Sequence, residues 1–133
     1  MPATTYMANL SLGNEFGTSG SYAPPASYWL GLSTSVIESD GVAVEPASGA
    51  YARVEIPNND AYWSTPASGS VTTSASVAFA QSSDSWGTIY SIFLADAITS
   101  GSILYYYNSY PTFPVVENTV VTFAEGSIMI TRT

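Results

Sequence analysis

The feature that most limits the fold of this chain is a series of short segments in which apolar and polar residues alternate. In residues 28–33, Tyr28, Leu30 and Leu32 alternate with Trp29, Gly31 and Ser33. Alternation with a period of two is typical of half-buried β-strands. Glycine, proline, asparagine and serine end each segment, and these residues favour turns. The pattern therefore predicts many short strands that are joined by turns.

Residues 51–57 alternate most clearly. The pattern places Ala52, Val54 and Ile56 on one face of a strand and Arg53 on the other. Pro57 and the Asn-Asn-Asp cluster after it are expected to end this strand.

Further strands are expected within residues 69–80, 88–94, 103–108, 119–123 and 127–131. We predict one hairpin from 88–94 and 103–108, and a second from the last two segments. In residues 69–80, Val77 and Phe79 should face the same way. Pro111 and Pro114 predict a loop. About seven or eight short strands with such turns are typical of a sandwich or barrel. We predict an all-β, antiparallel β-sandwich, with jelly-roll and Greek-key connections both left open.

Residues Thr5–Phe16 are expected to form a short helix that Thr4 or Thr5 caps. Tyr6, Met7 and Leu10 have the spacing of one apolar helical face. The alternative is an extended N-terminal arm. With 133 residues, the chain fits a single domain, 1–133, in which 1–26 are the helix or arm and a loop.

Charge and composition exclude several classes of protein. Hydrophobic residues make up 46% of the chain and charged residues only 9%, which is the opposite of a disordered chain. Two arginines, no lysine and ten acidic residues give a net charge of −8. Binding to nucleic acid or to an anionic membrane needs many cations, so we expect neither partner. A surface with few charges suits permanent contacts with other proteins, because little charge must be desolvated.

The residue types that carry most enzyme chemistry are missing. The chain has no histidine, cysteine or lysine, so it lacks the usual general base, thiol nucleophile and Schiff-base amine. We therefore expect no enzyme, no catalytic residue and no cofactor. A pair of carboxylates could hydrolyse a glycoside, but the acidic residues are scattered through expected loops. These residues are Glu38, Asp40, Glu45, Asp60, Asp84, Asp96, Glu117 and Glu125.

Two acidic clusters have the atoms for calcium but not the spacing of a known calcium loop. They are Glu38-Ser39-Asp40-Gly41 and Asn58-Asn59-Asp60. Turn formation by the Asp and Asn side chains is the preferred interpretation, and we predict no metal site.

Aromatic residues make up 14% of the chain and are the more informative group. Rings in expected loops either pack those loops down or form contacts with a partner protein, and they could also stack on sugars. One ring of the Tyr105–Tyr107 run should also lie on an outer surface. We predict a partner interface from Tyr22, Tyr62, Trp63, Tyr106, Tyr110 and Phe113.

Several stretches resemble, in order, a family of small structural proteins of tailed bacteriophages. They are SYWLGLSTS, GAYARVEIP, the long segment from GSVTTSASV to GSILYY, and VVTFAEGSIMITR. Within them, the family elements correspond to Tyr51-Ala52-Arg53, Trp86-Gly87-Thr88, Leu94-Ala95-Asp96-Ala97 and Phe123-Ala124-Glu125-Gly126. The chain has Leu94-Ala95 where the family usually has a phenylalanine before the aspartate.

The resemblance implies a virion component that is assembled in the host cytoplasm. Members are described as tail fibre proteins, and similar β-sandwich proteins are capsid cement proteins that sit as trimers on the head. Because the chain has no recognisable fibre shaft, the first hypothesis is a cement protein that binds the major capsid protein and copies of itself. The alternative is a tail fibre or tail-tip module that binds a host-surface sugar or protein. A small glycan-processing enzyme is a third and weaker hypothesis.

Overall fold

The computed structural model describes residues 1–18, 22–108 and 111–132. One helix and a set of short strands follow one another along the chain. Their bounds are α1 (Thr5–Phe16), β1 (Ser27–Ser33), β2 (Val54–Pro57), β3 (Ser70–Thr72), β4 (Val77–Ala78), β5 (Gly87–Ile89), β6 (Ser91–Ala95), β7 (Ile103–Tyr107), β8 (Phe113–Val115), β9 (Thr122–Phe123) and β10 (Met129–Thr131).

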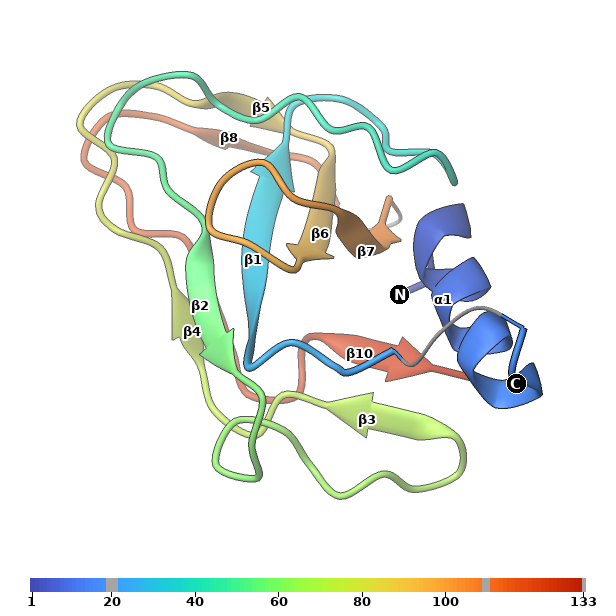
Figure 1. Cartoon of the computed structure of the whole chain (residues 1–133). Coiled ribbons are helices and arrows are strands. Elements are labelled where there is room, and N and C mark those ends of the chain that lie inside the picture. Colours follow the sequence, from blue (N-terminus) through green and yellow to red (C-terminus); the bar gives the residue numbers. More distant parts are fainter. Residues whose placement is uncertain (19–21, 109–110, 133) are drawn as a thin grey trace.

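The strands form one four-stranded antiparallel sheet in the order β2-β1-β6-β7. Three antiparallel two-stranded ribbons, β10-β3, β4-β9 and β5-β8, complete the β-structure. Figure 1 shows the large sheet at the centre of the molecule, with the ribbons around one side of it and α1 beyond β7. The predicted all-β, antiparallel class with a short N-terminal helix is confirmed. The layer opposite the large sheet is divided into the three ribbons.

Two expected strands are each divided in the structure. The segment 69–80 contains β3 and β4, which pair with β10 and β9 respectively. The segment 88–94 contributes to β5 and β6, with Tyr90 between them. The hairpin that was predicted from 88–94 and 103–108 is present as β6-β7, and its connection covers residues 96–102.

The second predicted hairpin is wrong. Residues 119–123 and 127–131 contribute β9 and β10, but these strands pair with β4 and β3 rather than with each other. The region around Pro114 was predicted to be a loop, yet it forms β8 on β5. Proline cannot donate to a partner strand, but a two-stranded ribbon leaves one edge of each strand unpaired. Pro114 is therefore tolerated there.

The segment 51–57 also differs from its prediction. The strand β2 begins only at Val54, Ala52 is exposed, and Arg53 is buried. Alternation identified Ile56 correctly as a core residue, with no exposed surface. The alternation did not predict burial correctly before Val54, because that part of the segment is not a strand. Arg53 is buried there by its polar contacts and not by the alternation of side chains in a strand.

The main core lies between the large sheet and the ribbons. Leu30, Leu32 and Ile56 contribute from the sheet, while Phe79 and Phe123 contribute from the ribbon β4-β9 and its flank. Val77 and Phe79 are both buried, as predicted. Tyr51, Phe79, Trp86 and Phe123 form a chain of ring contacts with centroids 5.3–6.3 Å apart. Such aromatic pairs add to the free energy of burial.

The opposite face of the large sheet is covered by the long connection between β1 and β2. Ile37 from this connection, Phe93, Ala95 and Ile103 form a second buried cluster. Every residue of β6 is therefore buried. Gly31 lies directly opposite Phe93 in the register, and a Cβ atom on Gly31 would come within 2.2 Å of the Phe93 ring. Only glycine leaves room for that ring.

Three polar side chains fasten this covering connection. The Arg53 guanidinium donates to both carboxylate oxygens of Glu45, with each N···O distance 2.9 Å. It also donates to the backbone oxygens of Ala97 and Ser100, and it lies 5.2 Å from the Phe93 ring centroid. The Tyr51 hydroxyl donates to Glu45 at 2.8 Å. The Tyr-Ala-Arg element is thus structural.

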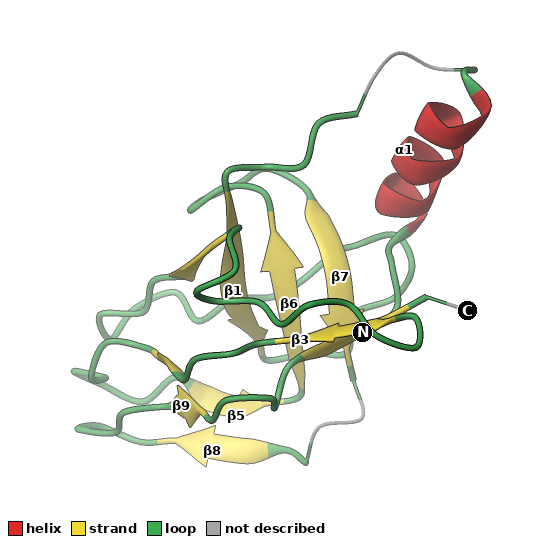
Figure 2. Ribbon diagram, turned by 90° about the horizontal axis from the view of Figure 1, so that it is seen from below, coloured by secondary structure: helices red, strands yellow, loops and turns green. Residues whose placement is uncertain are grey.

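The helix α1 packs against the outer edge of the large sheet, beside β7, and otherwise extends away from the body (Figure 2). Thr4 caps it: its Oγ1 accepts from the Met7 backbone N–H at 3.3 Å and donates to the Ile103 carbonyl at 2.7 Å. Gly17 ends the helix in the left-handed conformation, with φ 65°. The expected helix and its bounds are confirmed. The predicted apolar face of the helix packs only in part against the body of the protein: Met7 is buried, whereas Tyr6 is 47% exposed.

Candidate ligand groove

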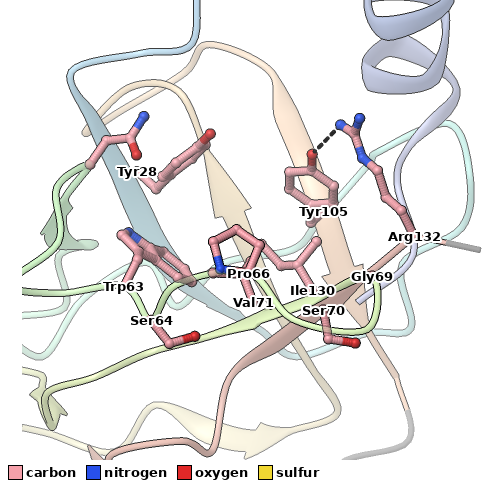
Figure 3. Close-up of a pocket in the computed structure, with 11 residues that line it drawn as sticks. Tyr28, Trp63, Ser64, Pro66, Gly69, Ser70, Val71, Tyr105, Ile130 and Arg132 are labelled. Carbon is pink, nitrogen blue, oxygen red and sulfur yellow. Dashed lines mark hydrogen bonds between the residues drawn. The ribbon is translucent and has the colours of Figure 1, made fainter.

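A cavity of about 490 Å³ lies between the start of β1, the ribbon β10-β3 and β7. Figure 3 shows rings and small polar side chains around it, drawn from segments far apart in the sequence. Its lining residues are Tyr28, Asn58, Trp63, Ser64, Pro66, Gly69, Ser70, Val71, Tyr105, Ile130 and Arg132. We call this cavity the aromatic groove.

Aromatic rings and apolar side chains provide most of the surface of the groove. Trp63 is buried, with 8% of its surface exposed. Its ring contacts the Tyr28 ring edge to face, with the two centroids 5.8 Å apart. A backbone bridge between Trp63 and Thr73 fixes the position of the indole relative to the ribbon. Val71 and Ile130 are cross-strand partners in that ribbon. The sheet and ribbon therefore hold the rings in place before any ligand arrives.

One end of the groove is rich in hydrogen-bond donors. The Arg132 Nη2 donates to the Tyr105 hydroxyl at 3.3 Å and to Ser11 Oγ at 3.3 Å, and Figure 3 shows the first of these bonds. The hydrogen bond to Tyr105 raises the pKa of Arg132. Burial raises the pKa of Tyr28 to about 12, with a smaller effect from Tyr22 and Tyr105. Tyr28 is thus a neutral phenol and Arg132 a cation at physiological pH.

Asn58 brings an acceptor to the groove. Its side-chain N–H donates to the Pro25 carbonyl at 3.0 Å, and its backbone N–H donates to the Ala26 carbonyl at 3.0 Å. These bonds fix the amide just beyond β2. They use the nitrogen of the amide and leave the Oδ1 atom without a partner among the described residues. The groove therefore combines apolar faces, several donors and one oriented acceptor.

The predicted interface residues do not form one surface. Trp63 lies in the groove, and Tyr62, next to it in the chain, is 36% exposed. Tyr22 packs against the main core from beside α1, and Tyr106 packs against the second cluster around Phe93. Phe113 is part of β8, not of a loop, and is half-buried against the main core. Tyr110 lies outside the described residues. That these residues contact a partner stays a prediction.

Sequence patterns alone did not identify the other groove residues. Tyr28 and Tyr105 have strand alternation, which indicates core as readily as a binding site. Asn58 looks like a turn residue in the sequence. Arg132 offered the best signal: it is one of two basic residues in a chain of net charge −8. Only the pairing of β3 with β10 places it beside Tyr105.

The two clusters that were considered for calcium contain side chains that act as turn residues. Asp40 Oδ1 accepts from the Val42 N–H, and Asn59 Oδ1 accepts from the Ala61 N–H. Within residues 1–18, 22–108 and 111–132, no three acidic side chains come together as a metal site would need. The same ranges contain no helix with the length and apolar character to cross a membrane.

The elements that first suggested a phage protein have structural roles. Trp86 is buried and donates from Nε1 to the Gly49 carbonyl at 2.8 Å. The Asp96 carboxylate accepts from the Ser102 N–H in the β6–β7 connection. Neither Trp86 nor Asp96 lines the aromatic groove.

Comparison with known proteins supports the same grouping. No curated protein sequence matches the chain at a significant level. The model of one family, described as podophage GP4 fiber I protein gp80, matches residues 2–131. The match covers nearly the whole chain, including the core and every residue of the aromatic groove except Arg132. The chain is a bacteriophage structural protein, and it belongs to the family of the podophage GP4 fiber I protein gp80.

Proposed function

We propose that this protein is a tail fibre component that binds a sugar on the host surface through the aromatic groove. The observation that carries this proposal is the groove itself: three aromatic residues with polar side chains at their edges, in a family of phage fibre proteins. A virion component is implied by the family. That the groove binds a host-surface sugar is our proposal.

A sugar fits the chemistry of this groove better than an apolar ligand does. One face of a sugar ring carries C–H groups and packs on aromatic rings, while its hydroxyls need donors and acceptors at the edges. Tyr28 and Trp63 supply the first kind of surface. Asn58, Ser64 and Ser70 supply polar atoms around it. Binding sites for small molecules commonly combine a mainly apolar lining with a few oriented polar groups.

The family description favours the fibre hypothesis over the capsid cement hypothesis. The matched family is that of a fibre protein, whereas trimer formation and binding to the major capsid protein remain predictions from the sequence. The preformed groove adds a second argument, because a cement protein needs a broad contact surface more than it needs a hollow of this size.

Competition for adsorption tests the proposal. Purified protein is added in increasing amounts to host cells before the phage that encodes it, and free phage is counted. The wild-type protein should reduce adsorption, and Tyr28→Leu should lose this effect. Leucine keeps apolar packing at this half-buried position but removes the ring that contacts Trp63.

Tyr90→Ala is the matched control, since Tyr90 is 44% exposed and does not line the groove. It should compete as well as the wild-type protein. Melting curves establish that each variant is folded. If folded Tyr28→Leu competes as strongly as the wild-type protein, the groove is not the receptor site. If the wild-type protein does not compete at all, the receptor-binding function is wrong.

A further inference from the structure

The two arginines differ in what they have available for a ligand. The Arg53 guanidinium is engaged by Glu45 and by two backbone carbonyls. Arg132, in contrast, is exposed and uses only Nη2, for two hydroxyl groups. Among the described residues, no carboxylate lies within 4.0 Å of it. Its Nε and Nη1 groups therefore remain open for hydrogen bonds.

The neighbours of Arg132 in the groove are also donors. Because the Tyr105 hydroxyl accepts from Arg132, its own proton is directed elsewhere. The Tyr28 hydroxyl points towards the same end of the groove (Figure 3), and Arg132 and Tyr105 both influence its pKa. No aspartate or glutamate lines the groove. A cation with two phenol donors and no opposing carboxylate matches a group that only accepts hydrogen bonds.

From this geometry we infer that the groove selects sugars that carry an anionic group, a carboxylate or a phosphate, which binds at Arg132 and Tyr105. The sugar ring then packs on Tyr28 and Trp63, and Asn58 accepts from a ring hydroxyl. The inference rests on the proposed function, and it specifies in addition that the sugar carries a negative charge. Guanidinium groups bind both kinds of anion through paired N–H donors, so carboxylate and phosphate sources share this chemistry.

The acidic character of the whole chain does not oppose this assignment. The net charge of −8 is spread over the molecule, and at physiological ionic strength charges more than about 8 Å apart are largely screened. Glu15, on the far side of Arg132 from the groove, shares with it a smaller hollow. The Glu15 carboxylate adds a smaller contribution to the raised pKa of Arg132, and Glu15 does not line the groove.

Matched pairs of charged and neutral sugars test the inference. The pairs are 3′-sialyllactose with lactose, trigalacturonate with its methyl ester, and mannose 6-phosphate with mannose. Binding to the full chain is followed by calorimetry and by the NMR signal of the Trp63 indole N–H, which Trp63→Phe assigns. In at least one pair the charged member should bind about tenfold more tightly, as one charge-assisted hydrogen bond predicts. The first two pairs report on carboxylates and the third on phosphates.

Variants at Arg132 connect the preference to this residue. Arg132→Gln should remove the preference, measured as the ratio of the two affinities within a pair, while Arg132→Lys should retain part of it. Equal binding of both members of every pair, or a preference that survives in Arg132→Gln, overturns the inference and leaves the proposed function standing. If none of these sugars binds at millimolar concentrations, the inference is overturned, and the adsorption experiment decides the proposed function separately.

Discussion

Arg53 and Arg132 are the only basic side chains of the sequence, and their surroundings give them opposite roles. Arg53 is 6% exposed as a side chain and forms a two-point ion pair with Glu45. Arg132 is exposed at the mouth of a groove. The first fixes the connection that covers the outer face of the sheet, and the second is available to a ligand.

Replacing each arginine by methionine separates these roles. Arg53→Met leaves the Glu45 carboxylate without its cation and leaves two carbonyls without a donor, so it should lower the free energy of unfolding by about 3 kcal/mol. Arg132→Met should change it by no more than about 0.5 kcal/mol, as for most exposed positions. Urea unfolding at neutral pH measures both. Similar losses in the two variants would contradict the assigned roles.

Tyr51 gives the stability of the fold a dependence on alkaline pH. Burial raises the pKa of Tyr51 above its ordinary value, although its hydrogen bond with the Leu32 backbone lowers it. The phenol stays neutral in the folded state while the unfolded chain ionises at a pH of about 10. Its contribution to stability is therefore complete below that pH and is lost as the pH rises above it.

Tyr51→Phe should accordingly flatten the decline of stability above a pH of about 10, by up to about 1.4 kcal/mol per pH unit. The variant should also be less stable at neutral pH, because Glu45 loses the hydroxyl donor. Unfolding by urea at several pH values from neutral to alkaline measures both effects. An unchanged slope would mean that Tyr51 ionises equally well in the folded protein.

At the scale of elements, Thr4 joins the start of α1 to the large sheet. Thr4 is 1% exposed and joins the first turn of the helix to β7 through the Ile103 carbonyl. Thr4→Ala should cost about 1–2 kcal/mol, the usual effect of losing an N-cap. Thr5→Ala, at the exposed next position, should have little effect. Urea unfolding compares them, and equal effects would show that Thr4 does not act as the cap.

The elements that were predicted correctly are those with local signals. The helix has a threonine cap, a periodic face and a terminal glycine, and the β6-β7 hairpin has two apolar segments around a turn. The pairing of β9 with β4 and of β10 with β3 could not be predicted in this way. Residues 119–131 satisfy the local pattern of a hairpin. They pair elsewhere because Val121, Phe123 and Ile128 are buried in the shared core.

At the scale of the whole molecule, local sequence patterns could not predict the groove either, because it depends on contacts between distant segments. Trp63 was singled out from its place in an expected loop, but its ring contact with Tyr28 depends on β1, β2 and the following turn being packed together. Arg132 reaches Tyr105 only because β10 crosses beside β7. Composition led us to expect no nucleic-acid binding and no chemistry based on histidine, cysteine or lysine. The position of a site formed by four distant segments is instead a property of the fold.

The overall architecture also protects the large sheet from contacts with other sheets. The large sheet is covered on both faces, and residues 2–4 extend along the edge of β7 through backbone hydrogen bonds and a bridge from Ala3 to Tyr105. Covered edges resist unwanted pairing between sheets. The aromatic groove opens between β1, β7 and the ribbon β10-β3, and α1 packs at the β7 edge (Figure 2).

The number of copies of this protein in each virion tests the fibre assignment most directly. Mass spectrometry of purified particles would compare its amount with those of the major capsid and tail tube proteins. We predict a few to a few dozen copies per particle, released together with the tail when heads and tails are separated. A ratio near one per major capsid subunit, or retention on tailless heads, would contradict the account and would support a capsid cement protein instead.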